Sequence, residues 1–323
     1  MRVPVSPYQG HDPVITILHS TDRPKSLDGP NVRYVTDETL TAALPGTEIL
    51  LVWDFTSTAV HDTWPAADAV RWVHTASAGV DRLAFPALLD SDATLTNSRG
   101  VFDTPIAEYV TGLVIAMAKD LPGTLAAQAQ REWRHRESER VGGRTAVVVG
   151  SGPVGRATAA LLAAVGMRVE LVGRREGEGV HAVDALPDLL PRAEWLVLAA
   201  PLTDATRGLL DAAALAALPP GARVINVGRG ALVVQDDLVE ALASGHLGGA
   251  ALDVFEREPL PADSPLWKLP GVIVSPHMSG DVVGWRDELE TLFVDNLARY
   301  RRGADLRNVV DKTLGFVTSG SNR

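Results

Sequence analysis

The sequence contains no cysteine among its 323 residues. A chain without cysteine has no disulfide bond, no thiolate nucleophile and no cysteine-ligated metal, and it suits a reducing compartment. Long apolar runs are also missing, because the longest, Ile106–Ala118, contains Glu108 and Thr111 and is too short to cross a bilayer. We therefore expect a soluble protein with no membrane partner and no metal centre.

Acidic residues outnumber basic residues in this chain. It has 30 Lys and Arg and 40 Asp and Glu, which gives a net charge of −10. This charge disfavours nucleic acid as a partner, because phosphate binding needs a basic surface. A small anion would need a locally basic site. The amino terminus, MRVPVSPYQGHD, lacks the apolar segment of a secretory signal peptide, so we expect a cytoplasmic protein.

Hydrophobic residues make up 46% of the chain and charged residues 22%, as in folded globular proteins, and disorder is expected only in the first dozen residues and from Thr318 to Arg323. The length favours two domains. Short β-type runs alternate with helical stretches, which predicts parallel sheets covered by helices on both faces. The expected strands are Ile15–His19, Val32–Val35, Ile49–Trp53, Trp72–Thr75, Thr94–Asn97, Ala146–Val149, Arg168–Val172, Trp195–Ala199, Val224–Val227, Ala250–Val254 and Val272–Ser275.

Helix boundaries suggest how the domains divide. Thr104-Pro105 begins an apolar helix that we expect to lead from a first domain into a second, and Asp211 occupies an N-cap position. A return near Asp281 would let a carboxy-terminal helix, about 286–302, pack on the first domain. The predicted fold class is α/β, with two doubly wound parallel-sheet domains. Their boundaries are residues 1–103 with 282–323, and residues 104–281.

A glycine-rich turn follows one β-run: Gly150-Ser-Gly152-Pro153-Val154-Gly155. Gly150 permits the tight turn, Gly152 lets backbone amides approach a pyrophosphate, and Gly155 lets the next helix pack closely on the strand. Pro153 removes one amide that could donate to phosphate. The preceding strand and following amphipathic helix favour dinucleotide binding over a purely structural turn.

The next strand ends in a pair of arginines, Arg174 and Arg175. An acidic residue at this point would bind the ribose hydroxyls of NAD, whereas two guanidinium groups suit the 2′-phosphate of NADP. Glu170 lies inside the strand and is not counted as a ribose ligand. We expect NADP as the preferred cofactor, with NAD possible; a solvated basic turn is the other interpretation of the pair.

Three later segments each follow or end an expected strand, and they contain Arg229, Glu258 and His277. Ligands bind at the carboxyl ends of strands in a doubly wound sheet. An arginine, a carboxylate and a histidine are what reduction of a 2-ketoacid requires. Each alone has an ordinary structural interpretation. His74 and His246 are expected to be structural or solvated.

The sequence resembles the D-isomer-specific 2-hydroxyacid dehydrogenases over nearly its whole length. The likeness rests on the motifs above and on four further stretches: 75–81, 96–109, Trp133 and 308–316. The last looks like the glyoxylate and hydroxypyruvate reductase branch. The resemblance implies a flavodoxin-like substrate domain and a Rossmann-like dinucleotide-binding domain, an active site in the cleft between them, and a homodimer.

The resemblance also implies roles for individual residues. Arg229 would grip the substrate carboxylate and touch the keto oxygen, because its planar guanidinium can hold both. His277 would protonate that oxygen as hydride arrives, and Glu258 would orient His277 and favour its charged form. Backbone amides of Ala78 and Gly79 would bind the other face of the carboxylate.

Further positions match the family's cofactor and substrate sites. Asp253 matches the residue that holds the nicotinamide carboxamide. The residues expected to line the cofactor are Pro201, Val227 and Gly228. Trp53 and Trp285 are either walls of the substrate pocket or core residues.

The expected activity is reduction of a small 2-ketoacid such as glyoxylate or hydroxypyruvate. A formate or phosphite dehydrogenase is an alternative that the Ser77-Ala78-Gly79 loop and the reductase-like ending disfavour. A nicotinamide-sensing corepressor of the same fold is a second alternative. Such corepressors normally carry long disordered flanks, which we do not expect here.

Overall fold

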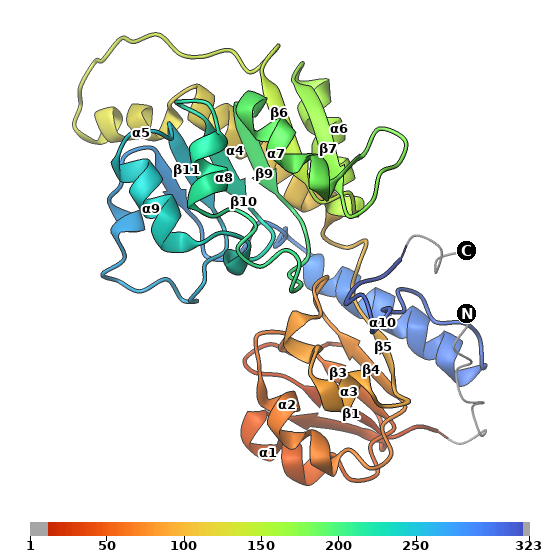
Figure 1. Ribbon diagram of the computed structural model, residues 1–323. Coiled ribbons are helices and arrows are strands. Elements are labelled where there is room, and N and C mark those ends of the chain that lie inside the picture. The colour runs from red at the N-terminus through yellow and green to blue at the C-terminus, as the bar shows by residue number, and fades with distance from the viewer. Residues whose placement is uncertain (1–11, 319–323) are drawn as a thin grey trace. The chain divides into compact units, whose positions relative to one another are not determined.

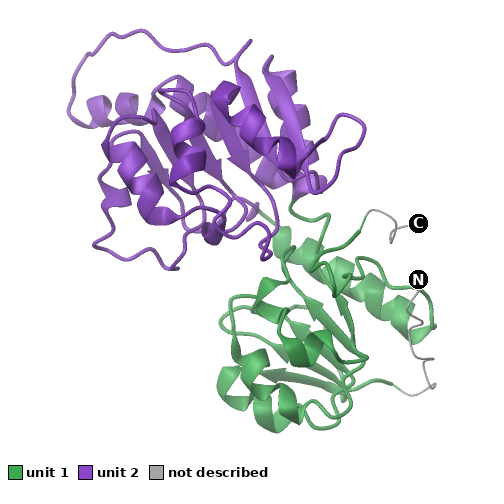
Figure 2. Cartoon of the chain, in the orientation of Figure 1, with its two compact units in different colours: residues 1–102, 283–323 green, residues 103–282 purple. Residues whose placement is uncertain are grey.

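The computed structural model describes residues 12–318 of the chain, which divides into two compact units (Figure 2). Unit 1 comprises residues 1–102 and 283–323, and unit 2 comprises residues 103–282. The two ends for which composition predicts disorder lie outside the described residues, apart from Asp12 and Thr318.

Unit 1 is built on a five-stranded parallel sheet in the order β2-β1-β3-β4-β5 (Figure 1). Its strands are β1 (Ile15–Leu18), β2 (Val32–Val35), β3 (Ile49–Val52), β4 (Trp72–Thr75) and β5 (Thr94–Thr96). Its helices are α1 (Asp37–Ala43), α2 (Ala59–Thr63), α3 (Pro86–Leu89) and α10 (Trp285–Arg301), with 3₁₀ turns η1 (Trp64–Ala66) and η2 (Asp81–Leu83). Every residue of β1, β3 and β4 is buried, and β3 accordingly reads as a continuous apolar run, ILLV.

Helix α10 packs on the sheet of unit 1, as expected for the returning end of the chain. The indole of Trp72 stacks on the rings of Phe293 and Tyr300, with centroids 5.2 Å and 5.5 Å away. The buried Glu290 of the same helix accepts hydrogen bonds from the backbone amides of Lys25 and Ser26, at 2.9 Å and 2.6 Å. Aromatic stacking and charged hydrogen bonds therefore tie residues far apart in sequence into one unit.

His74 is a buried histidine in the centre of unit 1, as the sequence suggested for a structural residue. Its Nδ1 lies 2.7 Å from the hydroxyl of Thr96 and its Nε2 lies 3.3 Å from that of Ser98. The residue is only 1% exposed. Burial lowers the pKa of His74 to about 3, because the charged ring would be removed from water without a carboxylate partner.

We predict that this histidine makes the protein less stable in acid. Between the ordinary pKa of His and about pH 3, His74 is protonated in the unfolded chain but neutral in the folded protein. The free energy of unfolding should therefore fall by about 1.4 kcal/mol for each unit by which the pH is lowered. The loss should reach about 2 kcal/mol on going from about pH 6.5 to about pH 5. Urea unfolding of the wild type and His74→Gln at both pH values checks this. The variant should start less stable and lose less; equal losses would remove His74 as the cause.

Unit 2 contains a seven-stranded parallel sheet in the order β12-β11-β10-β9-β6-β7-β8. Its strands are β6 (Thr145–Val149), β7 (Arg168–Gly173), β8 (His181–Ala182), β9 (Trp195–Leu198), β10 (Arg223–Asn226), β11 (Gly249–Leu252) and β12 (Val272–Val274). Its helices are α4 (Asp103–Ala118), α5 (Leu121–Ala129), α6 (Pro153–Ala164), α7 (Leu186–Leu189), α8 (Ala212–Ala217) and α9 (Gln235–Ala243), with 3₁₀ turns η3 (Val183–Ala185), η4 (Leu190–Arg192), η5 (Gly230–Leu232) and η6 (Pro265–Trp267).

Helices cover both faces of this sheet, with α8 and α9 on one face and α4 on the other (Figure 1). Alternate residues of β6 point to opposite faces of the sheet, and each face has its own hydrophobic core. Val147 and Val149 pack with residues of α7, α8 and α9, whereas Ala146 and Val148 pack with residues of α4 and α6. The predicted α/β class with two doubly wound parallel sheets is confirmed.

Within residues 12–318 no single helix is both long and apolar enough to cross a membrane. Helices α4 and α5 satisfy the length and composition test only when taken together, and they are bent by 64° at the break between them.

Candidate active site

The three segments with the predicted catalytic residues leave neighbouring strands of unit 2. Strands β10, β11 and β12 lie side by side and parallel, so the loops after them emerge at the same edge of the sheet. Arg229 follows β10, Glu258 lies on the connection after β11, and His277 follows β12. The order of the strands therefore groups residues that are 48 positions apart in the sequence, from 229 to 277.

His277 and Glu258 form a hydrogen-bonded pair. Oε2 of Glu258 lies 2.8 Å from Nδ1 of His277, and Oε1 accepts the backbone amide of Phe255 at 3.0 Å. An ionised carboxylate can only accept hydrogen bonds. The Nδ1 atom of His277 therefore carries a hydrogen and donates a hydrogen bond to Glu258. The other ring nitrogen, Nε2, is left for a reacting group, and the His277 side chain is 43% exposed.

The charge of Glu258 is maintained by its surroundings. Burial alone would raise the pKa of Glu258, but the hydrogen bond and positive charge of His277, the Phe255 amide and the charge of Arg229 together lower it below its usual value. Because the charge of Arg229 acts on Glu258, its guanidinium lies within electrostatic range of that carboxylate. The structure thus brings an arginine, a carboxylate and an imidazole together within one unit.

A buried asparagine that sequence analysis did not single out holds the Arg229 loop. Asn226, the last residue of β10, is 1% exposed; its Nδ2 donates to the carbonyl of Arg229 at 2.9 Å and its Oδ1 accepts the amide of Gly228 at 3.1 Å. Gly230 packs directly against the Phe255–Glu256 peptide. A Cβ at position 230 would lie only 1.8 Å from the carbonyl carbon of Phe255, so no larger residue fits there. The Arg229 loop is therefore packed directly on the loop that leads to Glu258.

His277 has a left-handed backbone, with φ of 54°. Such a conformation is uncommon for a residue other than glycine and persists where its surroundings impose it. The fully buried carboxylate of Asp253 accepts hydrogen bonds from the amides of Met278 and Ser279, the two residues that follow His277. A polar residue at the end of a neighbouring strand therefore holds this loop too.

The glycine-rich turn leads into α6 as the sequence predicts. Gly150 has φ of 123°, Gly152 is the N-cap of α6, and Pro153 is its first residue. Within residues 12–318 the backbone amides of Ser151 and Gly152 have no hydrogen-bond partner. A Cβ on Gly152 would meet no atom within 4 Å, so the space beside the turn is open. Free amides at a helix amino terminus fit the pyrophosphate of a nicotinamide dinucleotide.

The remaining cofactor positions lie at neighbouring strand ends. Arg174 and Arg175 are both exposed just after β7. Glu170, within β7, lies 2.7 Å from Nε2 of His181 and is thus engaged by a protein partner. Pro201 follows β9 and is exposed, whereas Val227 and Gly228 follow β10 and are buried.

The predicted substrate-binding residues of unit 1 fall into two groups. The amides of Ala78 and Gly79, in the loop after β4, have no partner within the part of the chain that the structure describes. Trp53 and Trp285 are only 6% and 8% exposed, and Trp285 contacts the ring of Phe55 edge-on at 6.2 Å. This burial accords with the core interpretation of the two tryptophans.

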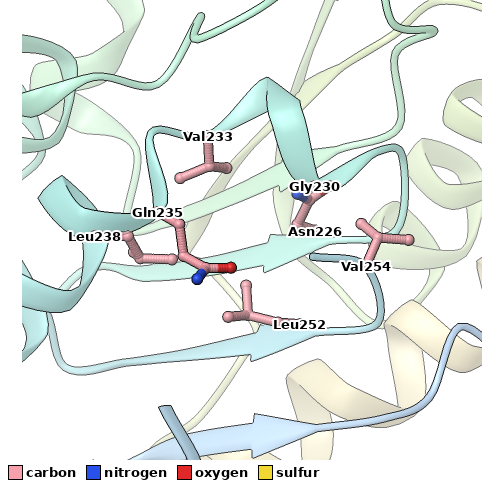
Figure 3. Close-up of a pocket in the computed structure, with 7 residues that line it drawn as sticks. All are labelled: Asn226, Gly230, Val233, Gln235, Leu238, Leu252 and Val254. Carbon is pink, nitrogen blue, oxygen red and sulfur yellow. The ribbon is translucent and has the colours of Figure 1, made fainter. Parts of the chain in front are cut away.

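A small pocket in unit 2 lies beside the Arg229 loop, and Arg229, Glu258 and His277 are not among its lining residues (Figure 3). It is lined by Asn226, Gly230, Val233, Gln235, Leu238, Leu252 and Val254. Most of these residues are aliphatic and buried, so we interpret the space as a packing gap beneath the Arg229 loop.

Comparison with known proteins identifies the family. Residues 111–279 match the family model described as D-isomer specific 2-hydroxyacid dehydrogenase, NAD binding domain. The chain belongs to this family. It is therefore an NAD(P)-dependent oxidoreductase.

Relatives of this dehydrogenase include proteins of different length. It is 28% identical over 311 residues to the D-3-phosphoglycerate dehydrogenase of Methanocaldococcus jannaschii, covering 93% of this chain but only 58% of that protein. Among solved structures, it is similar to an NADPH-dependent glyoxylate/hydroxypyruvate reductase of Sinorhizobium meliloti in complex with NADP and sulfate, with 30% identity, TM-score 0.80, and coverage of 94% of this chain and 99% of that one.

A D-isomer specific 2-hydroxyacid dehydrogenase of Xanthobacter autotrophicus Py2, in complex with NADPH and MES, is similar to the same degree. It is 30% identical with a TM-score of 0.79, and the alignment covers 94% of this chain and all of that one. Both alignments extend over the two units.

Proposed function

We propose that this enzyme reduces a small 2-ketoacid, such as glyoxylate or hydroxypyruvate, with NADPH as the preferred reductant. The observation that carries the proposal is the His277–Glu258 pair, at 2.8 Å, within electrostatic range of Arg229 at the strand ends of unit 2. The similar S. meliloti protein, named as an NADPH-dependent glyoxylate/hydroxypyruvate reductase, supports the choice of substrate and cofactor.

The cofactor, when bound, supplies a hydride to the keto carbon. His277 then has one task, which is to deliver the proton on Nε2 to the keto oxygen as negative charge develops there. Glu258 keeps the ring in the required orientation by accepting a hydrogen bond from Nδ1. In the reverse direction the neutral ring accepts the proton from the hydroxyl group.

Binding of the substrate carboxylate is assigned to Arg229. A planar guanidinium can donate parallel hydrogen bonds to a carboxylate and still reach the adjacent keto oxygen. The bonds of Asn226 to Gly228 and Arg229 stabilise the loop in which this side chain lies. The amides of Ala78 and Gly79 in unit 1, which have no partner within residues 12–318, are likewise proposed to bind carboxylate.

The deciding experiment is steady-state kinetics on a panel of 2-ketoacids, including glyoxylate, hydroxypyruvate, pyruvate and phosphohydroxypyruvate. We expect oxidation of NADPH, followed by its absorbance, with at least one of the small members. Formate and phosphite, offered with oxidised cofactor, test the alternative dehydrogenase activities. A protein that binds NADPH tightly but turns over none of these compounds would instead favour a nicotinamide-sensing binding role.

The preference for NADPH rests on Arg174 and Arg175, which are both exposed after β7. Replacing both with alanine removes the cations proposed to bind the 2′-phosphate, so we predict that the KM for NADPH rises about 10- to 100-fold. The KM for NADH should change by less than about twofold, because NADH has no 2′-phosphate. Parallel kinetics with both cofactors measure this. Equal effects on NADPH and NADH would show that the arginines do not select the cofactor.

We also propose a homodimer. Trp133 is 100% exposed in a segment of unit 2 without helix or strand, and the end of that segment is fixed by paired hydrogen bonds between Glu139 and Arg223, at 2.7 Å and 3.1 Å. An indole held in water on an anchored segment is suited to burial against a second copy. Light scattering in solution should give about twice the chain mass of 34.3 kDa.

A further inference from the structure

The side chain of Ser151, in the glycine-rich turn, lies against the carboxyl end of β7. Gly173 is the last residue of that strand and is buried. A Cβ on Gly173 would overlap Oγ of Ser151 and would lie 2.9 Å from the Cβ of the serine. The glycine therefore leaves a space beside the strand end, and the Ser151 side chain fills it.

The hydroxyl of Ser151 has no hydrogen-bond partner within residues 12–318, although the backbone around it is held in place. The amide of Gly150 donates to the carbonyl of Val172, in β7, at 2.8 Å, and Nε of Arg156 donates to the carbonyl of Ser151 itself at 2.9 Å. The serine is only partly buried. A donor that is fixed in position and has no partner among the described residues is available to a ligand.

The expected position of a dinucleotide indicates which group that ligand presents. At such a turn the pyrophosphate lies at the amino terminus of the helix, and the adenosine ribose lies at the end of the second strand. Ser151 belongs to the turn and contacts the end of the second strand, so its hydroxyl lies on the ribose side. Arg174 and Arg175 follow Gly173 and are exposed. A hydroxyl can donate to a phosphate oxygen, and bonds to a charged acceptor are stronger than bonds between neutral groups.

We propose that Ser151 helps to select NADPH by donating a hydrogen bond from its hydroxyl to the 2′-phosphate, beside the two arginines that follow β7. Gly173 makes this possible, because a side chain at that position would displace the serine. The inference rests on the proposed preference for NADPH, and it adds a specificity-determining residue in the turn to the pair at the strand end. Reduction of a ketoacid does not depend on it.

The test uses the full-length enzyme and two nucleotides, 2′,5′-ADP and 5′-AMP, which differ only by the 2′-phosphate and need no turnover. Calorimetric titration of the wild type should show tighter binding of 2′,5′-ADP. Ser151→Ala should raise the Kd for 2′,5′-ADP about tenfold and the Kd for 5′-AMP by less than about twofold, because only the first nucleotide loses a charged hydrogen bond.

The outcomes separate this inference from the proposed cofactor preference. Equal weakening of both nucleotides would mean that the hydroxyl binds a group that they share, and would overturn the inference. If the wild type prefers 2′,5′-ADP and Ser151→Ala keeps that preference unchanged, the inference fails and the preference for NADPH stands. A wild type that binds the two nucleotides equally well would contradict both.

Three further measurements complete the design. Ser151→Ala should unfold at the wild-type urea concentration without nucleotide, whereas loss of a structural serine would lower that concentration. Ser244→Ala is the matched control and should keep both Kd values, because this exposed serine at the end of α9 donates to the carbonyl of Ala241 at 3.1 Å. Ser151→Gly combined with Gly173→Ser moves the hydroxyl across the contact to the strand end, and it should restore the preference that Ser151→Gly alone loses.

Discussion

Replacing His277 by alanine should lower kcat for ketoacid reduction by about 10²- to 10⁴-fold and leave the Kd for NADPH near its wild-type value. The proton that His277 supplies through Nε2 has no substitute among the neighbouring groups, since Glu258 is held ionised by a lowered pKa and Arg229 does not release its proton. Steady-state kinetics with the best ketoacid, together with fluorescence titration of NADPH, measure the two quantities.

Two other variants sharpen this result. Glu258→Gln keeps a hydrogen-bond acceptor near Nδ1 but loses the negative charge, so it should lower kcat less than His277→Ala. His246→Ala is the matched control, because His246 lies in the same unit and its Nε2 lies 3.1 Å from the carbonyl oxygen of Leu215, away from the His277–Glu258 pair. If His277→Ala retained turnover, or fell no further than His246→Ala, His277 would lose its role as the acid.

Burial makes most of the strands predicted from the sequence apolar, although β2 and β12 were predicted with at most one buried residue each. All eleven expected strands are present, most within one residue of the observed bounds, because buried parallel strands such as Ile49–Val52 and Trp195–Leu198 leave a continuous apolar signal. Strand β8 was not predicted. It consists of only His181 and Ala182 at the edge of the sheet, both half-buried, so it has no such signal.

The candidate site divides in the same way. Arg229, Glu258 and His277 could be named from the sequence because their side-chain chemistry and their places after strands are both visible there. Asn226 and Ser275 were missed, since an asparagine or serine near a strand end has no distinctive pattern until the fold shows which amides and carboxylates it meets. The residues proposed to do chemistry are thus recognisable by type, whereas the residues that hold them in place are recognised only from tertiary contacts.

The glycines of the dinucleotide turn allow ligand binding and folding to be separated by experiment. A Cβ at position 155 would lie 1.7 Å from the carbonyl oxygen of Gly150, an overlap that neither backbone can avoid without moving. Alanine favours a helix over glycine by up to about 1 kcal/mol, which is too little to offset such a clash. We therefore predict that Gly155→Ala lowers the free energy of unfolding by about 3 kcal/mol or more.

Gly152→Ala should behave in the opposite way. A Cβ at this position meets no described atom within 4 Å and the φ of −71° suits any residue, so without cofactor the variant should lose at most about 1 kcal/mol of stability, the cost of alanine in place of glycine at an N-cap. The added methyl would instead occupy the space through which the pyrophosphate approaches the amides of Ser151 and Gly152, and the Kd for NADPH should rise at least about tenfold, or about 1.4 kcal/mol. Urea unfolding without cofactor and NADPH titration of both variants measure the two effects.

Gly112→Ala in α4, where a Cβ is also unobstructed, controls for helix propensity. Tight NADPH binding by Gly152→Ala would mean that the phosphates do not lie over this turn, because phosphates bound there would collide with the added methyl group.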